Sequence, residues 1–507
     1  MNAIKLLVTL IVITSVLGCK QNNLENTTDI VTQTKEDANG FSYESVTNDP
    51  TGLRLYTLDN GLKVYLGKNE DEPKIQTLIA VRAGSTYDPE DNTGLAHYLE
   101  HMVFKGTDEI GTQNWQKEKQ LISKISELYE QHKNEKDPIT KQAIYKDIDS
   151  VSQEASKYSI ANEYDKMISS LGAENTNAFT STEETVYISK IPSNEIDKWL
   201  KVESERFSQL VLRLFHTELE AVYEEFNRGQ DSDGRKHYAA VLEGLFPNHP
   251  YGTQSTIGTS EHLKNPSMVA INNYFEPIYY DGLLNINYNE NKFIFPNNDY
   301  FLLGVKEAEI GEPIEKVVYG PTTESVYVSF RTKGVGSKDE QIVTLIDYIL
   351  ANSAAGLIDL DLNQQQKVQR ASSFTNFDND YGMHILYGIP KAEQSLDEVK
   401  SLLLGELEKV KQGKFDEWLI DAVVNDLKKS RIQQYENNSA TAYAYLDAFI
   451  GKQDWEKRLK FLNELKSITK QELVEFANAH YKNNYVVAFK KQGKDSTTVK
   501  VENPNIT

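Results

Sequence analysis

The strands and helices predicted by this sequence follow one order twice. In each half a strand is followed by a helix, then by two strands, and then by two more helices. The first set is predicted at residues 76–83, 93–104, 176–181, 185–191, 193–209 and 217–229. The second set is predicted at residues 325–333, 339–353, 369–377, 382–389, 395–412 and 415–435. This order predicts an α+β fold of two similar units, each a mostly antiparallel sheet with helices packed on one face.

The N-terminus has the composition of a bacterial export signal. Lys5 precedes a short apolar run from Leu6 to Leu17, and a polar stretch begins at Lys20. About a dozen apolar residues are too few to cross a bilayer, but they suit a signal peptide. Cys19 ends a Val-Leu-Gly-Cys sequence that resembles a lipobox, in which the cysteine receives the lipid. We therefore expect an exported bacterial lipoprotein, lipidated at Cys19, on the periplasmic side or at the outer membrane; a plain signal peptide is the alternative.

The repeat and the export signal divide the chain into segments. The predicted segments are a signal peptide at 1–18, a flexible tether at 19–48, a first unit at 49–305, a second unit at 306–495 and a linker-like tail at 496–507. Lys, Glu, Ile and Leu at helical spacing predict a helical insertion near 113–169 in the first unit. Residues 279–312 follow no clear pattern and receive no assignment.

Charge and cysteine content exclude two classes of interaction. The formal net charge is −21, whereas proteins that bind nucleic acid cluster Lys and Arg against the phosphates. We therefore expect no nucleic-acid partner. Cys19 is the only cysteine, so disulfides do not stabilise the fold. No later segment is apolar enough to cross a membrane, so we expect contact with a membrane through the N-terminal lipid only.

His97 and His101 carry the strongest chemical signal. They are four residues apart in a predicted helix, so both imidazoles lie on one face and can bind one ion. Glu100 lies beside them and can take a proton from a metal-bound water, whose pKa zinc lowers to near neutrality. This His-x-x-Glu-His order is a zinc-protease motif, and chance would produce it roughly 0.02 times in a chain of this composition. The alternative is a pair of histidines satisfied by packing or hydrogen bonds.

A catalytic zinc also needs a third protein ligand. The predicted helix at 217–229 has one pair of acids on each flank of its apolar stripe. Glu218 and Glu225 lie on one flank, and Glu220 and Glu224 lie on the other. Glu218 and Glu225 are about two turns apart and point the same way. Periodicity does not choose between the two flanks, and a solvated acidic face is the alternative.

Four segments together resemble the pitrilysin family of zinc peptidases, which includes insulin-degrading enzyme and the mitochondrial processing peptidase. The segments are 97–101, 104–107, 177–181 and 218–225. The resemblance implies that Glu225 is the third ligand of one Zn²⁺ and that Glu218 supports the site from outside.

The resemblance also implies how substrate binds. It implies that Asn177, Ala178, Phe179 and Thr180 form an edge strand with which an extended substrate peptide pairs. The implied activity is that of a zinc-dependent endopeptidase acting on peptides or small unfolded proteins. A purely structural zinc is disfavoured, because such sites usually take four Cys or His ligands.

The second unit is predicted to be non-catalytic. Its matching helix at 339–353 carries Ile342, Val343, Leu345 and Ile349 where ligands would be needed. The chain resembles the front half of a long bacterial family member, and such members close a chamber by apposing two double units. We therefore expect a second half-chain or a homodimer partner. The alternative function is a non-catalytic or half-protein subunit that needs a partner half for activity.

Overall fold

The computed structural model describes residues 29–283, 305–496 and 499–501, and for 276–283 the backbone alone. The predicted signal peptide and the predicted lipidation site Cys19 lie outside the described residues, as does most of the unassigned stretch at 279–312. Within the described part, no helix combines the length and the apolar character needed to cross a membrane.

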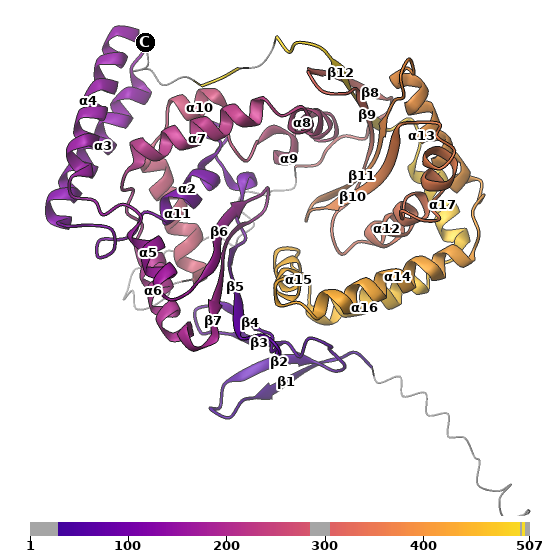
Figure 1. Cartoon of the computed structure of the whole chain (residues 1–507), viewed down its shortest axis with the longest axis horizontal. Helices are drawn as coiled ribbons and strands as arrows, with labels where there is room; N and C mark the ends of the chain where they lie inside the picture. Colours follow the sequence, from indigo (N-terminus) through magenta and orange to yellow (C-terminus); the bar gives the residue numbers. More distant parts are fainter. Residues whose placement is uncertain (1–28, 284–304, 497–498, 502–507) are drawn as a thin grey trace, which may run out of the picture.

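The described chain begins with a sheet rather than with a tether. β1 (Thr32–Glu36), β2 (Ser42–Val46), β3 (Arg54–Thr57) and β4 (Lys63–Leu66) form one four-stranded antiparallel sheet (Figure 1). The prediction of a flexible tether over 19–48 is therefore wrong for the residues of β1 and β2.

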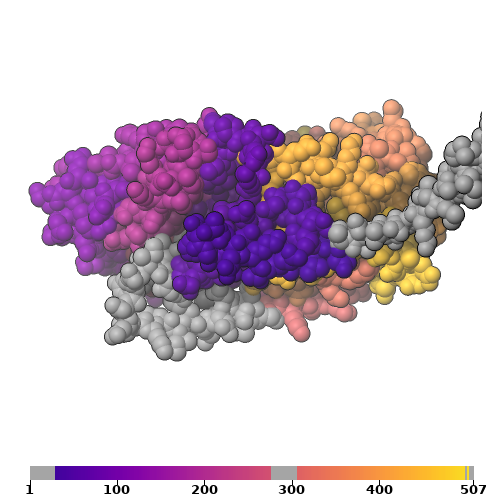
Figure 2. Space-filling model, turned by 90° about the horizontal axis from the view of Figure 1, so that it is seen from below, coloured from indigo at the N-terminus to yellow at the C-terminus, as the bar shows by residue number. Residues whose placement is uncertain are grey.

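The turn between β1 and β2 explains the hairpin. The Asp37 carboxylate accepts hydrogen bonds from the backbone N–H groups of Asn39 (2.8 Å) and Phe41 (3.0 Å). All five residues of β1 are exposed, so no apolar alternation marks the strand in the sequence. The sheet is held by the second unit, where Trp455 donates its Nε1–H to Asp49 (2.8 Å). Figure 2 shows the indigo N-terminal residues lying against yellow-orange residues of the second unit.

The first unit is built on a three-stranded antiparallel sheet. Its strands are β5 (Lys74–Val81), β6 (Glu174–Thr180) and β7 (Thr185–Pro192), in the order β5-β7-β6. The helices of this unit that form its core with the sheet are α2 (Leu95–Val103), α6 (Ile196–Ser208), α7 (Phe215–Gln230) and α11 (Met268–Leu283). Between α2 and β6 the chain forms α3 (Trp115–Asn134), α4 (Pro138–Ser156) and α5 (Glu163–Ser170), of which α3 and α4 pair side by side.

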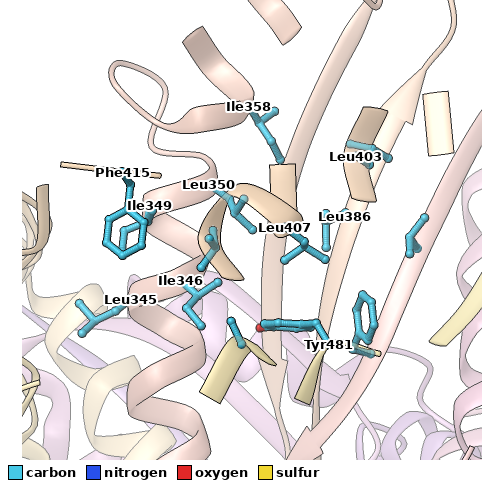
Figure 3. Close-up of a cluster of buried hydrophobic side chains, with 14 of the residues drawn as sticks. Leu345, Ile346, Ile349, Leu350, Ile358, Leu386, Leu403, Leu407, Phe415 and Tyr481 are labelled. Carbon is cyan, nitrogen blue, oxygen red and sulfur yellow. The ribbon is translucent and has the colours of Figure 1, made fainter. Parts of the chain in front are cut away.

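The second unit is built on a five-stranded sheet. Its strands are β8 (Ile314–Gly320), β9 (Ser325–Lys333), β10 (Arg370–Phe377), β11 (Tyr381–Ile389) and β12 (Tyr485–Gln492), in the order β10-β11-β9-β12-β8. Among the described strands of this sheet, only the β8–β12 pair is parallel. The helices on one face are α12 (Lys338–Leu350), α13 (Leu396–Lys411), α14 (Trp418–Tyr435), α16 (Trp455–Lys466) and α17 (Lys470–His480). In Figure 3, Ile346 and Leu350 of α12 point toward Leu386 of β11 and Leu407 of α13.

The two units repeat each other in strand order and in detail. The order β6-β7-β5 matches β10-β11-β9, which confirms the predicted fold class. A glycine lies under each hairpin tip: a Cβ at Gly84 would lie 2.2 Å from the Ser181 carbonyl oxygen, and one at Gly334 would lie 2.3 Å from that of Asn379. Because those gaps are shorter than any van der Waals contact, each tip requires the absence of a side chain.

Each unit lends one helix to the sheet of the other. α8 (Asp233–Leu245) follows α7 in the chain but packs on β8, β9 and β12, where Val241 joins a cluster with Val486. α15 (Asn438–Ile450) follows α14 but runs along β5 of the first unit. Its two ends are fixed there, because Asn438 donates to the Lys74 carbonyl (3.1 Å) and Arg82 donates to the Phe449 carbonyl (2.7 Å).

The end of the described chain returns to the first unit. Val501 is buried in the apolar cluster that contains α2 and α7. Its backbone N–H donates to Asn227 Oδ1 and its carbonyl accepts from Asn227 Nδ2, both at 2.8 Å. The prediction of a linker-like tail over 496–507 is therefore wrong at Val501, because an apolar residue there finds a buried place on α7.

Candidate active site

Helix α2 carries the predicted histidine motif, with His97 and Glu100 buried and His101 half-buried. At its start the Asp88 carboxylate accepts the backbone N–H groups of Gly94 (2.7 Å) and Ala96 (2.9 Å). Burial raises the pKa of Asp88 to about 7, against the opposing effect of these hydrogen bonds. Further along, the buried Tyr98 hydroxyl donates to the Phe215 carbonyl (2.6 Å) and ties α2 to the start of α7. These contacts fix the two helices that carry the candidate ligands.

His97, His101 and Glu225 meet between α2 and α7. The two imidazole rings lie 4.7 Å apart between centroids. Glu225 Oε2 lies 3.6 Å from His97 Nε2 and 3.8 Å from His101 Nε2. One ligand atom from each of the three residues lies within 4.8 Å of the others, and no other group of His, Cys, Asp or Glu in the described part of the chain comes together in this way.

These residues fit a catalytic zinc. Separations of 3.6 and 3.8 Å are too long for hydrogen bonds. They suit metal ligands better, since two atoms about 2 Å from a tetrahedral ion lie roughly 3.3 Å apart. Two imidazole nitrogens and one carboxylate oxygen are also a donor set of catalytic zinc sites, which leave a fourth position open. Burial lowers the pKa of His97 to about 3, with a further contribution from His101, so its imidazole is neutral and can act as a ligand.

Glu218 lies behind His101 and fixes its orientation. His101 Nδ1 lies 2.8 Å from Glu218 Oε1, and Lys105 Nζ lies 2.6 Å from Glu218 Oε2. Burial would raise the pKa of Glu218, but these two hydrogen bonds outweigh burial and hold the pKa below its usual value. The ionised carboxylate therefore accepts the Nδ1 proton of His101, which leaves Nε2 free to bind a metal.

Glu100 is the other acidic group at this place. It is buried, with 7% of its surface exposed. Its Oε2 accepts a hydrogen bond from the Thr180 hydroxyl (2.7 Å) at the end of β6. Burial raises the pKa of Glu100, and the Thr180 hydrogen bond acts in the opposite direction. The site thus combines helix α2, helix α7 and strand β6.

The structure shows which of the two acidic flanks of α7 faces the histidines, a choice that periodicity could not make. Glu225 faces the histidine pair and Glu218 lies behind it, whereas Glu220 and Glu224 are exposed. Sequence reasoning missed Asp88 and Lys105. Lys105 stands four residues after His101, a helical spacing that could have drawn attention to it. No local pattern marked Asp88.

The predicted substrate strand lies at the edge of its sheet. β6 pairs with β7 on one side only in the described part of the chain. Ala178 is buried against α2, Asn177 is exposed, and the Phe179 ring lies 6.5 Å from that of Tyr443 on α15. Thr180 differs from the other three, because its hydroxyl donates a hydrogen bond to Glu100.

Comparison with known proteins agrees with the two-unit structure. The family described as insulinase (peptidase family M16) matches residues 63–128 and 151–254, which include the histidine motif and Glu225. The family described as the peptidase M16 inactive domain matches residues 295–427, which include β9 to β11. The buried residues Ile342, Val343, Leu345 and Ile349 of α12 lie within this second match.

Individual relatives are similar over most of the chain. An uncharacterized zinc protease, YmxG of Bacillus subtilis, is 22% identical over 86% of this chain and 97% of its own. A protease of Helicobacter pylori shares the fold with a TM-score of 0.68 and 19% identity, over 87% of this chain and 99% of that one. Pitrilysin matches with a TM-score of 0.62 and 18% identity, over 93% of this chain but only 48% of its own. The chain therefore belongs to the M16 peptidases, the insulinase- and pitrilysin-like family, as the motif resemblance predicted.

Proposed function

We propose that this protein is a zinc-dependent endopeptidase that hydrolyses peptides or small unfolded proteins. His97, His101 and Glu225 would hold one Zn²⁺ per chain. The observation that carries the proposal is the meeting of these three ligand atoms within 4.8 Å, with the buried Glu100 one residue from His101. The relatives named as zinc proteases support the same activity.

The residues around the metal would divide the work. When bound, zinc supplies a Lewis acid that lowers the pKa of water and polarises the peptide carbonyl. Glu100 accepts the proton of the attacking water and returns it to the leaving amine. Thr180 orients Glu100 through its hydroxyl, and Glu218 holds the His101 ring so that Nε2 is directed at the metal. The substrate backbone pairs with the free edge of β6, from Asn177 to Thr180, which brings the scissile carbonyl toward Glu100.

Two variants test the proposal. Glu100→Gln keeps the shape of the side chain but removes the base, so we expect about one zinc per chain and loss of cleavage of a quenched peptide, by roughly 10²- to 10⁴-fold. Glu225→Ala removes a ligand, so we expect loss of both zinc and cleavage. Zinc content by atomic absorption and cleavage by fluorescence separate the two results. Cleavage by Glu100→Gln at the wild-type rate would contradict the proposed mechanism.

A second candidate is suggested by the comparison with pitrilysin. The chain matches about half of pitrilysin, at 48% of that chain. A subunit that needs a partner half, either a second copy or a separate half-chain, is therefore the alternative. Light scattering and the peptide assay, run on the same samples over a range of concentrations, distinguish the two. Activity that follows the fraction of dimer supports the second copy, and full activity of the monomer refutes it.

The place of the protein in the cell is a further part of the proposal. We propose an exported lipoprotein anchored through Cys19, on the sequence pattern alone. Cys19→Ser in the full-length chain should move the protein from the membrane fraction to the soluble fraction. Retention of this variant in the membrane fraction would contradict anchoring by the lipid.

A further inference from the structure

The tips of the two equivalent hairpins touch. Glu183 lies in the turn between β6 and β7 of the first unit, and Asn379 lies in the turn between β10 and β11 of the second. The backbone N–H of Asn379 lies 3.1 Å from both carboxylate oxygens of Glu183, and Asn379 Nδ2 lies 2.6 Å from Oε2. The Tyr251 hydroxyl also donates to Glu183. With only 7% of its surface exposed, Glu183 is almost wholly enclosed by these donors.

Asn379 also reaches the helix that the second unit lends to the first. Its Nδ2 donates to the Ile450 carbonyl at the end of α15 (3.0 Å). The next residue, Asp380, donates its backbone N–H to the Tyr251 hydroxyl (3.1 Å). Asn379 therefore joins the hairpin of the first unit to α15 of the second.

The same hairpin carries the hydroxyl that holds Glu100. Thr180 is three residues before Glu183, and Thr180 Oγ1 donates to Glu100 Oε2. From the other side, the backbone N–H groups of Ser85 and Thr86 donate to the carbonyls at 181 and 182, each at 3.0 Å. The hairpin is thus held at two places. Backbone hydrogen bonds from Ser85 and Thr86 hold one side, and the hydrogen bonds between Asn379 and Glu183 hold the turn.

We propose that Asn379 is a positioning residue of the proposed peptidase. From the inactive second unit it fixes Glu183, and through the hairpin it fixes the Thr180 hydroxyl on Glu100. This inference rests on the proposed function and adds a role for the unit that lacks the histidine motif. A side chain that positions the base affects the rate of the chemical step more than it affects substrate or metal binding.

A matched pair of variants tests the role. Asn379→Ala removes the side-chain bonds to Glu183 and to the Ile450 carbonyl. Asn363→Ala is the control, because Asn363 is also part-buried in the second unit and makes two hydrogen bonds with the backbone of Ala371 (2.8 and 2.9 Å), which lies at the start of β10 and not in the turn that carries Asn379. We expect Asn379→Ala to lower kcat by roughly tenfold with KM and zinc content unchanged. The control Asn363→Ala should lower the melting temperature by about as much as Asn379→Ala does, but its kcat should equal that of the wild type.

Two further measurements keep the test decisive. Thr180→Val removes the hydroxyl, so adding Asn379→Ala to it should cost little more in kcat, because both changes act through one contact. Hydrogen exchange in the metal-free protein should rise at Ser85, Thr86 and Ser181 in Asn379→Ala but not in Asn363→Ala.

The outcomes separate this inference from the proposed function. Wild-type kcat in Asn379→Ala, or fully additive losses in the double variant, would overturn the positioning role while zinc and cleavage in the wild type still stood. Absence of zinc and cleavage in the wild type would overturn the proposed function, and the exchange measurement would still report whether Asn379 holds the hairpin.

Discussion

His101 Nδ1 lies 2.8 Å from Glu218 Oε1, so the ring that faces Glu225 is held from behind by a second acid of the same helix α7. Lys105 keeps that acid ionised from its other oxygen. One helix therefore supplies both a candidate ligand and the group that orients another.

Replacing Glu218 should weaken zinc binding without abolishing it. In Glu218→Gln the amide no longer fixes the His101 tautomer, and loss of such an outer contact lowers metal affinity by about 10- to 100-fold. Competition with a chelator of known affinity measures the change. Glu224→Gln is the matched control, because Glu224 is an exposed acid of the same helix and should leave the affinity unchanged. Equal affinities for all three proteins would show that Glu218 does not support the site.

A buried histidine should make the fold sensitive to acid. His237 of α8 lies 2.7 Å from the Ala488 carbonyl of β12, and burial lowers its pKa to about 4. The unfolded chain takes up this proton near pH 6.5 and the folded chain only near pH 4, so stability is present above 6.5 and is lost as the pH falls between these values. The loss is about 1.4 kcal/mol per pH unit.

Replacing His237 should make the free energy of unfolding depend less steeply on pH. His237→Asn keeps a donor but does not titrate, so its free energy of unfolding in urea should change less steeply between pH 6.5 and 5 than that of the wild type. Equal slopes would mean that His237 is not protected from the proton in the folded protein.

A buried ion pair also holds α8 on the sheet of the second unit. Asp233 Oδ2 lies 3.0 Å from Lys490 Nζ of β12. Burial would raise the pKa of Asp233, but hydrogen bonds from Thr322 and Lys490 outweigh burial and lower it to about 2. The resulting stability is present above the unfolded pKa near 4 and is lost as the pH falls toward 2.

Asp233→Asn should therefore cost roughly 2 kcal/mol at neutral pH, and the cost should shrink below pH 4. Asp231→Asn is the control. Its ion pair with Lys500 (3.0 Å) is mostly exposed and should contribute at most about 1 kcal/mol. Chemical unfolding at pH 7 and pH 3 measures both. Equal losses of unfolding free energy in the two variants would contradict a larger contribution from the Asp233 ion pair.

Two glycines should respond to alanine in opposite directions. A Cβ at Gly84 would lie 2.2 Å from the Ser181 carbonyl oxygen, so Gly84→Ala should destabilise the fold by about 1–3 kcal/mol and disturb the hairpin that carries Thr180. Gly405 lies within α13 with nothing within 4 Å of its Cβ position, so Gly405→Ala should stabilise by roughly 0.5–1 kcal/mol. Melting curves of the two variants on the same side of the wild type would refute the steric argument.

Local patterns predicted the elements but not their partners. Apolar periodicity predicted the two matching series of strands and helices, because it reports which face of an element is buried. It does not report what covers that face, so the exchange of α8 and α15 between the units was beyond it. The β1–β2 hairpin was missed for a related reason, since its first strand buries nothing.

The candidate site divides in the same way. His97 and His101 are neighbours on one helix, and their spacing alone predicted that they share a face. The bonds from Thr180 to Glu100 and from Asn379 to Glu183 join residues 80 and 196 positions apart, and no local spacing encodes such pairs. Periodicity likewise offered two acidic flanks on α7, and only the packing of α7 on α2 distinguishes them.

The exchange of α8 and α15 sets a limit on how this chain can be shortened. A fragment cut between the units would leave β5 without α15 and β12 without α8, so apolar strand surface would meet water in both pieces. The unit that carries the histidines is therefore incomplete without α15. A stable fragment of this protein must therefore keep both units, because each unit covers strand surface of the other.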